Sequence, residues 1–131
     1  MKEITKLMMN EWKMQSMDWM GYALEKGEYF SYHHLRVPKR EGGSADVYNG
    51  AILIQSASHD YLHTIERCDR EMFEYITQIL IEINEQRYMP TKEQLIRIRD
   101  ALQTFENEWQ GKRTSKGKLI VKQRYLRRVY K

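Results

Sequence analysis

Hydrophobic residues near the start of the chain recur at helical spacing. They form two groups, Ile4, Leu7, Met8 and Trp12, followed by Met17, Met20 and Leu24. Steps of three and four residues without an intervening proline are typical of one face of an α-helix. The pattern predicts a helix over residues 4–24, ended by Gly27, because glycine commonly follows the last helical turn.

The next segment has the composition of a β-hairpin. Aromatic and β-branched residues crowd residues 28–37, which predicts a short strand closed by Pro38. Residues 39–48 are rich in loop-forming types, and Asn49-Gly50 predicts a tight turn into a second strand over residues 51–54. We therefore expect two antiparallel strands joined by an enlarged loop.

A long apolar stripe follows the hairpin, beginning after Ser58, which has the chemistry of an N-cap. Its members are Leu62, Ile65, Cys68, Met72, Ile76, Ile79 and Ile83. Because these residues share one helical face, they predict a helix that reaches about Arg87 and is the longest of the chain.

A second stripe begins after Pro90, where Thr91 and Gln94 match a capping box. It consists of Leu95, Ile98, Leu102, Phe105 and Trp109. Two successive helices predict a helical hairpin. The second stripe covers only about two heptads, which favours packing on the neighbouring helix, but a homodimer stays open.

These elements predict an α+β fold, mostly α, with a central hairpin flanked by an N-terminal helix and a C-terminal helical hairpin. A chain of 131 residues with 41% hydrophobic content fits one domain, which we assign to residues 1–111. Residues 112–131 hold nine basic and no acidic residues. Because the net charge of the whole chain is +4, residues 1–111 have a net charge of −5. This segment is expected to be a basic tail or, from the alternation in 118–122, an extra strand.

Three further observations narrow the class of protein. No run of about 18 uncharged apolar residues predicts a membrane span. The first residues lack a signal-peptide pattern because Trp12, Lys13 and Asp18 interrupt any apolar core, so we expect a cytoplasmic protein. Cys68 is the single cysteine and permits neither an internal disulfide nor sulfur-ligated zinc.

All four histidines lie between positions 33 and 63. His33 and His34 end the first predicted strand, whereas His59 and His63 are four apart at the start of the predicted helix. Residues four apart on a helix face the same side, so these two imidazoles can reach one metal ion.

Residues 29–66 resemble the HNH, or ββα-metal, endonuclease family. The resemblance rests on Tyr32-His33-His34-Leu35, Pro38, Gly42-Gly43, Asn49, the strand Ala51-Ile52-Leu53-Ile54, His59 and His63, in that order. It implies that His34 is the general base and that Asn49 steadies the loop and orients this base. It also implies that His33 and His59 are metal ligands, with His63 as an additional ligand. The gaps on either side of Asn49 each look about one residue longer than in the family.

The implied reaction is hydrolysis of phosphodiester bonds in DNA with one divalent metal ion. Three imidazoles suit zinc, nickel or manganese better than magnesium, although the identity stays open among these four. For contact with the nucleic-acid backbone we single out seven basic residues: Lys39, Arg40, Lys118, Lys122, Arg124, Arg127 and Arg128.

Two other interpretations are kept. The first is a non-catalytic protein of a phage or other mobile element that uses the same scaffold to bind nucleic acid or inhibit a protein partner. The second is a structural zinc site closed by all four histidines, with no open coordination position.

Overall fold

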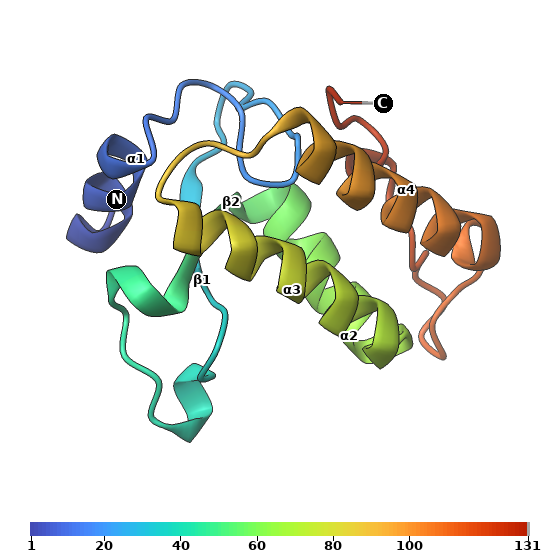
Figure 1. The fold of residues 1–131 in the computed structure, drawn as a ribbon. Coiled ribbons are helices and arrows are strands. Elements are labelled where there is room, and N and C mark those ends of the chain that lie inside the picture. Colours follow the sequence, from blue (N-terminus) through green and yellow to red (C-terminus); the bar gives the residue numbers. More distant parts are fainter. Residues whose placement is uncertain (131) are drawn as a thin grey trace.

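A two-stranded antiparallel sheet stands at the centre of the computed structural model, which describes residues 1–130 (Figure 1). Strand β1 spans Phe30–His34 and β2 spans Gly50–Ile54. The register pairs Phe30 with Ile54 at one end and His34 with Gly50 at the other. The antiparallel pairing expected from the sequence is therefore confirmed, although Asn49 ends a short 3-10 helix before β2 instead of forming a two-residue turn.

The sheet is followed by three helices. α2 (Asp60–Cys68) leaves β2 through a π-helical turn, Gln55–His59. α3 (Arg70–Gln86) packs against α2, and α4 (Lys92–Trp109) returns alongside α3 as the second arm of a helical hairpin (Figure 1). The expected capping box is present at the start of α4, where Thr91 and Gln94 cap each other's backbone.

The N-terminal helix is shorter than its periodicity predicted. α1 spans Glu3–Glu11 and ends before Lys13, whose φ of 56° is left-handed. The prediction of one helix over residues 4–24 is therefore wrong. Trp12 and Trp19 are fully buried with their rings 5.3 Å apart, and the Trp12 indole donates a hydrogen bond to the Ile83 carbonyl at 2.9 Å. The apolar residues fill the core from an irregular segment, which periodicity alone does not distinguish from a helix.

The second difference from the predicted elements is at Ser58, and Asp18 is its cause. Ser58 was expected to cap a helix, but its hydroxyl donates to the fully buried Asp18 carboxylate. The same carboxylate accepts hydrogen bonds from the backbone N–H groups of Met20, Tyr22 and Ile54. Asp18 thus joins the N-terminal segment, the end of β2 and the π-helical turn, and α2 begins only at Asp60.

The long helix expected over residues 59–87 is interrupted at Asp69. Asp69 is non-helical, with φ −151° and ψ 86°, and its carboxylate accepts a hydrogen bond from Met72 N at 3.0 Å, which caps α3. The prediction of one continuous helix is wrong because the apolar stripe crosses the break without a change of spacing. α4, with 18 residues, is longer than the 17-residue α3.

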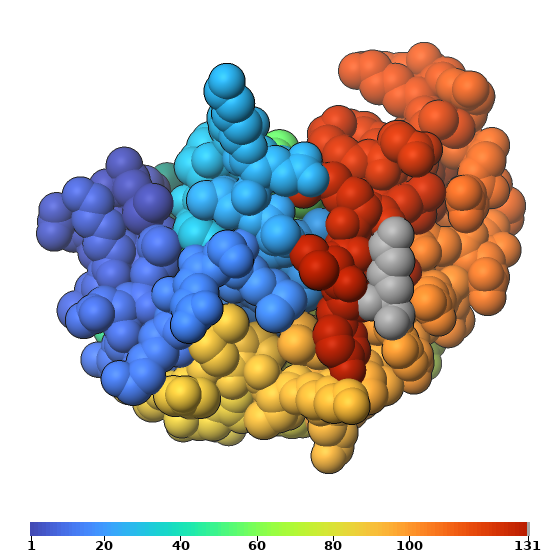
Figure 2. Space-filling view, turned by 90° about the horizontal axis from the view of Figure 1, so that it is seen from above, coloured from blue at the N-terminus to red at the C-terminus, as the bar shows by residue number. Residues whose placement is uncertain are grey.

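Residues 112–130 fold back over the body of the protein. Ile120, Val121 and Tyr125 are buried, and the Tyr125 ring stacks on Tyr61 at 4.3 Å. Figure 2 shows this segment lying across the molecule between residues near position 20 and the helix α4. Within residues 1–130 the sheet has two strands, so the third strand considered for residues 118–122 does not form. None of the helices in this range combines the length and apolarity needed to cross a membrane.

Candidate metal centre

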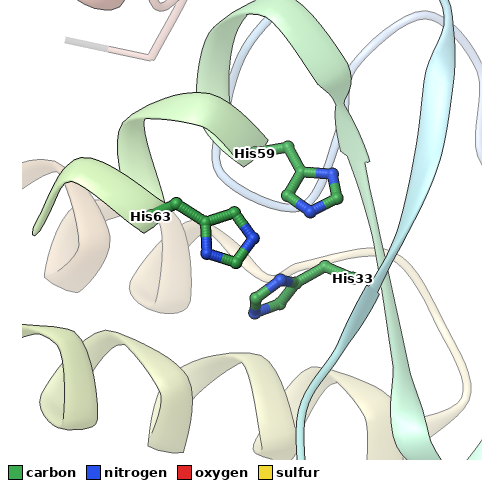
Figure 3. Close-up of side chains that lie close together, drawn as sticks. All are labelled: His33, His59 and His63. Atoms are coloured by element: carbon green, nitrogen blue, oxygen red, sulfur yellow. The ribbon is translucent and has the colours of Figure 1, made fainter. Parts of the chain in front are cut away.

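His33, His59 and His63 converge on one point between β1 and α2 (Figure 3). The ring centroids are 5.1 Å apart for His33 and His59, 5.3 Å for His33 and His63, and 5.0 Å for His59 and His63. One ring nitrogen from each residue lies within 4.8 Å of the others. The three side chains are close enough to hold a single metal ion.

The local structure explains this convergence. His33 lies opposite Ala51 in the sheet, and residues of a strand alternate between its two faces. His59 ends the π-helical turn and His63 lies one turn further along, in α2, so their rings project from the same side. The link from Ser58 to Asp18 fixes the π-helical turn from within the core and thereby sets the position of His59.

Burial keeps two of these imidazoles uncharged. His33 is 4% exposed and His59 9% exposed. Desolvation, reinforced by the neighbouring histidines, lowers the pKa of His33 well below its ordinary value of 6.5. Desolvation and the nearby His63 lower the pKa of His59 to about 4. Neutral imidazole is the form that donates a lone pair to a metal.

Hydrogen bonds hold two of the rings in place. His59 Nδ1 lies 2.6 Å from Ser31 Oγ, and His63 Nδ1 lies 3.1 Å from Glu66 Oε1. Both contacts use Nδ1, which leaves Nε2 of each ring free. His33 Nε2 is buried and has no hydrogen-bond partner among the described residues. Within residues 1–130 no side-chain hydrogen bond holds the His33 ring, and it lies beside two rings whose Nε2 atoms are free, so the three imidazoles can each offer one nitrogen to a shared ion.

The three histidines line a cleft of about 840 Å³ whose walls come from β1, the following loop, α2 and α3. His34, Lys39 and Arg40 line the same cleft. His34 is outside the group of three that could share an ion. A site closed by four histidines is therefore not formed, and the group of three leaves room for a further ligand.

Asn49 holds the loop that follows β1. Its Oδ1 accepts hydrogen bonds from Arg36 N at 2.7 Å and Val37 N at 2.9 Å. Its Nδ2 donates to Val37 O at 2.8 Å and Ser44 O at 3.1 Å. Asn49 is 4% exposed, and the partners in all of these hydrogen bonds belong to the same loop. Asn49 therefore joins Arg36, Val37 and Ser44 of this loop through its side-chain amide.

The two adjacent glycines of this loop are needed for different structural reasons. Gly42 adopts a left-handed φ of 85° at the end of a 3-10 turn, where a Cβ would meet nothing within 4 Å. A Cβ on Gly43 would lie 1.9 Å from the Val37 carbonyl oxygen. Gly43 is thus required by close backbone approach. Its backbone also lies close enough to the His34 ring to raise the pKa of that imidazole.

His34 faces the cleft from the other side of the strand. Desolvation lowers the pKa of His34, and although its hydrogen bond to the Gly43 backbone raises it, the net pKa stays below 6.5. The Tyr32 ring packs edge-on at 4.9 Å, and the Tyr32 hydroxyl donates to Asp46 O at 2.7 Å. His34 is therefore neutral near pH 7 and is flanked by groups tied to the same loop.

The basic residues expected to bind nucleic acid divide into two sets. Lys39 and Arg40 lie at the cleft and form no ion pair with any residue in the range 1–130. None of the residues 112–130 lines the cleft. Lys118, Lys122, Arg124, Arg127 and Arg128 therefore lie outside the walls of the cleft.

Most of the second set is paired within the protein. Lys122 and Arg124 lie 3.9 Å and 2.6 Å from Asp60, and Arg127 pairs with Glu25 and Glu28. An external phosphate would compete with these carboxylates. Lys118 forms no ion pair with a described residue and is exposed.

Arg128 has a different environment from the one expected. It is 4% exposed and makes a bidentate pair with Glu106, at 2.7 Å and 3.0 Å. Because the guanidinium is enclosed, we no longer assign Arg128 a contact with nucleic acid.

Sequence reasoning missed Ser31, Glu66 and Asp18. Ser31 carries a weak signal, since it lies two residues before His33 and therefore on the same strand face. Glu66 lies three positions after His63, a spacing at which helical side chains meet. Asp18 gives no such signal, because its partners lie up to 40 positions away.

Comparison of the chain with protein-family models, curated proteins and solved structures found no match.

Proposed function

We propose that this protein hydrolyses phosphodiester bonds of DNA at a metal centre held by His33, His59 and His63, with His34 as the general base. The observation that carries the proposal is the opening of the three-histidine cluster and of His34 onto one cleft. The succession of β1, β2 and α2 around that cluster is also the order of elements in the HNH family that residues 29–66 resemble.

The donor set indicates the class of metal. Three imidazole nitrogens favour zinc, nickel or manganese, whereas magnesium prefers oxygen ligands. An ion held there would polarise the scissile phosphate and stabilise the negative charge that develops on the departing sugar oxygen.

The residues around the ion supply the remaining chemistry. Neutral His34 takes one proton from a water molecule, whose oxygen forms a bond to phosphorus while the bond to the departing sugar oxygen breaks. That oxygen takes a proton from solvent. Asn49 and Gly43 keep the ring in place, through the loop and through the backbone contact respectively. Lys39 and Arg40, both at the cleft, contact neighbouring phosphates.

Plasmid cleavage tests the proposal. Wild type, His34→Ala and His59→Ala, purified identically, are incubated with supercoiled DNA in EDTA, Mg²⁺, Mn²⁺, Ni²⁺ or Zn²⁺, and metal binding is measured by calorimetry. We expect metal-dependent nicking by wild type. His34→Ala should bind metal normally but lose at least about a hundredfold in rate, in line with removal of a general base. His59→Ala should lose metal binding as well.

Two results would contradict the proposal. The first is cleavage by His34→Ala at the wild-type rate, which would remove His34 from the mechanism. The second is the absence of cleavage in every metal by a protein that binds both metal and DNA.

The second result would favour the alternative, a non-catalytic binding or inhibitory protein. One observation points in that direction: Glu41 lines the same cleft and forms no ion pair with any residue in the range 1–130, and its carboxylate suits a cationic partner better than a polyanion. Capture of a basic peptide at the cleft, weakened by Glu41→Gln, would support this alternative.

A further inference from the structure

Ser31 joins the sheet to the metal centre through a single hydroxyl. Its Oγ lies 2.9 Å from the Leu53 carbonyl oxygen and 2.6 Å from His59 Nδ1. A serine hydroxyl has one proton to donate, and a carbonyl oxygen has none. When the hydroxyl donates to Leu53, its contact with His59 requires that the imidazole N–H be the donor.

We infer that Ser31 is a positioning residue that fixes His59 as the Nδ1–H tautomer, so that the Nε2 lone pair faces His33 and His63. The inference rests on the proposed metal centre, because it assigns a role at that same centre. It concerns the orientation of a proton and places Ser31 in contact with the ligand rather than with the ion.

The opposite tautomer would disable the cluster. A hydrogen on His59 Nε2 would occupy the direction in which the lone pair must be offered, among nitrogens that lie within 4.8 Å of one another. Because His59 is only 9% exposed, water does not readily replace the Ser31 hydroxyl at Nδ1. Removing the hydroxyl therefore leaves the ring free to exchange its proton between the two nitrogens.

Glu66 selects the same tautomer at His63 through a carboxylate instead of a hydroxyl. A carboxylate is an acceptor only, so its 3.1 Å contact with His63 Nδ1 also selects the Nδ1–H form. Glu66 is further paired with Arg70 at 3.2 Å. The two helix-borne ligands thus receive matched tautomers, one from a neutral hydroxyl of the sheet and one from a charged group of α2.

Ring-nitrogen NMR of the metal-free protein tests the inference directly. Long-range proton–nitrogen correlation spectra of the wild type near pH 7 distinguish Nδ1–H from Nε2–H at His59. We expect Nδ1–H in wild type and in Ser31→Thr, which keeps the hydroxyl, and a mixture in Ser31→Ala. An Nε2–H form in wild type would overturn the inference without the use of any variant.

Zinc affinity provides the second measurement. We expect Ser31→Ala to bind Zn²⁺ about 10- to 100-fold more weakly than wild type in competition with a chromogenic chelator, as for loss of other ligand-orienting partners. Ser31→Thr should restore the affinity. Ser56→Ala is the matched control, because Ser56 also carries a bonded hydroxyl but donates it to Glu28. Circular dichroism establishes that each variant is folded.

The outcomes separate this inference from the proposed function. Equal Zn²⁺ affinity and an unchanged His59 tautomer in folded Ser31→Ala would overturn the role of Ser31 and leave the metal centre intact. Failure of the wild type to bind any metal would overturn the metal centre, and with it the role assigned to Ser31. Metal binding without DNA cleavage would overturn only the nuclease, since the tautomer and affinity measurements do not depend on activity.

Discussion

Asn49 and Val37 exchange two hydrogen bonds, with Val37 N donating to Asn49 Oδ1 at 2.9 Å and Asn49 Nδ2 donating to Val37 O at 2.8 Å. This reciprocal pair ties the start of β2 to the loop that follows β1. The loop carries Gly43, whose backbone contacts the His34 ring. The loop beside the proposed base is therefore held by a residue 15 positions further along the chain than His34.

Replacing this amide should damage both stability and chemistry. We expect Asn49→Ala to lower the free energy of unfolding by about 1–3 kcal/mol, because buried backbone groups lose their partners. DNA cleavage should fall by more than the unfolded fraction explains. Asn84→Ala is the matched control, since Asn84 is an equally buried amide that donates to Val47 O and Gly50 O. Urea unfolding and plasmid nicking measure the two effects, and equal losses of cleavage in both variants would contradict a specific role for Asn49.

The two loop glycines should respond differently to alanine. Gly42→Ala costs about 1–2 kcal/mol, from the left-handed backbone alone. Gly43→Ala should cost more and also displace the loop, because its Cβ would overlap the Val37 carbonyl. Thermal unfolding together with the NMR signals of His34 distinguishes the two variants. If Gly43→Ala were the milder change, the close approach described here would be wrong.

The buried pair of Arg128 and Glu106 makes a prediction for the basic segment. Arg128→Met should destabilise the protein by about 3–5 kcal/mol, because it leaves a buried carboxylate unpaired. Adding Glu106→Leu should restore a large part of the loss, since the double variant has no buried charge at this position. Chemical denaturation of the single and double variants closes the cycle. A single variant as stable as wild type would mean that Arg128 is available to external ligands after all.

Glu28 predicts a pH dependence of stability. Burial raises the pKa of Glu28, but hydrogen bonds from Ser56, the Glu25 backbone and Arg127 outweigh it, and the net pKa lies below 4.5. The folded protein therefore binds this proton less tightly than the unfolded chain. The stabilisation is complete above about pH 4.5 and is lost as the pH falls through the folded pKa.

The corresponding variant is Glu28→Gln. It should be less stable than wild type by about 1 kcal/mol near pH 7, and the difference should shrink near pH 3. Urea unfolding at the two pH values measures this change. Glu3→Gln, at the start of α1, is the control for a general effect of charge. A constant difference between Glu28→Gln and wild type across this range would contradict the assignment.

The elements that sequence reasoning placed correctly are those with local signals. Thr91 and Gln94 satisfy each other within one turn, and the two strands differ in composition from their surroundings. The pairing of His59 with His63 also followed from local geometry, namely a four-residue helical step, whereas His33 was joined to them only by the resemblance to the HNH family.

The remaining features depend on contacts distant in sequence. The shortened α1 reflects Trp12 bonding to Ile83, 71 positions away, and the π-helical turn reflects Asp18. The basic segment looked available for nucleic acid because its carboxylate partners, among them Glu28 and Glu106, are spread over the preceding chain. The break between α2 and α3 at Asp69 is a different case. Aspartate is a common N-cap residue, but the apolar stripe continues across the break and predicts one helix.

The folded segment after residue 112 also determines when, during translation, the contacts beside His59 can form. Tyr125 and Arg124 both bond to the Asp60 carboxylate, which directly follows His59, and Tyr125 lies 65 positions further along the chain. A ribosome adds residues in sequence, so all four histidines are synthesised well before their brace. The segment around His59 therefore reaches its final setting only after residue 125 has emerged, and the nascent chain carries an unbraced cluster until then.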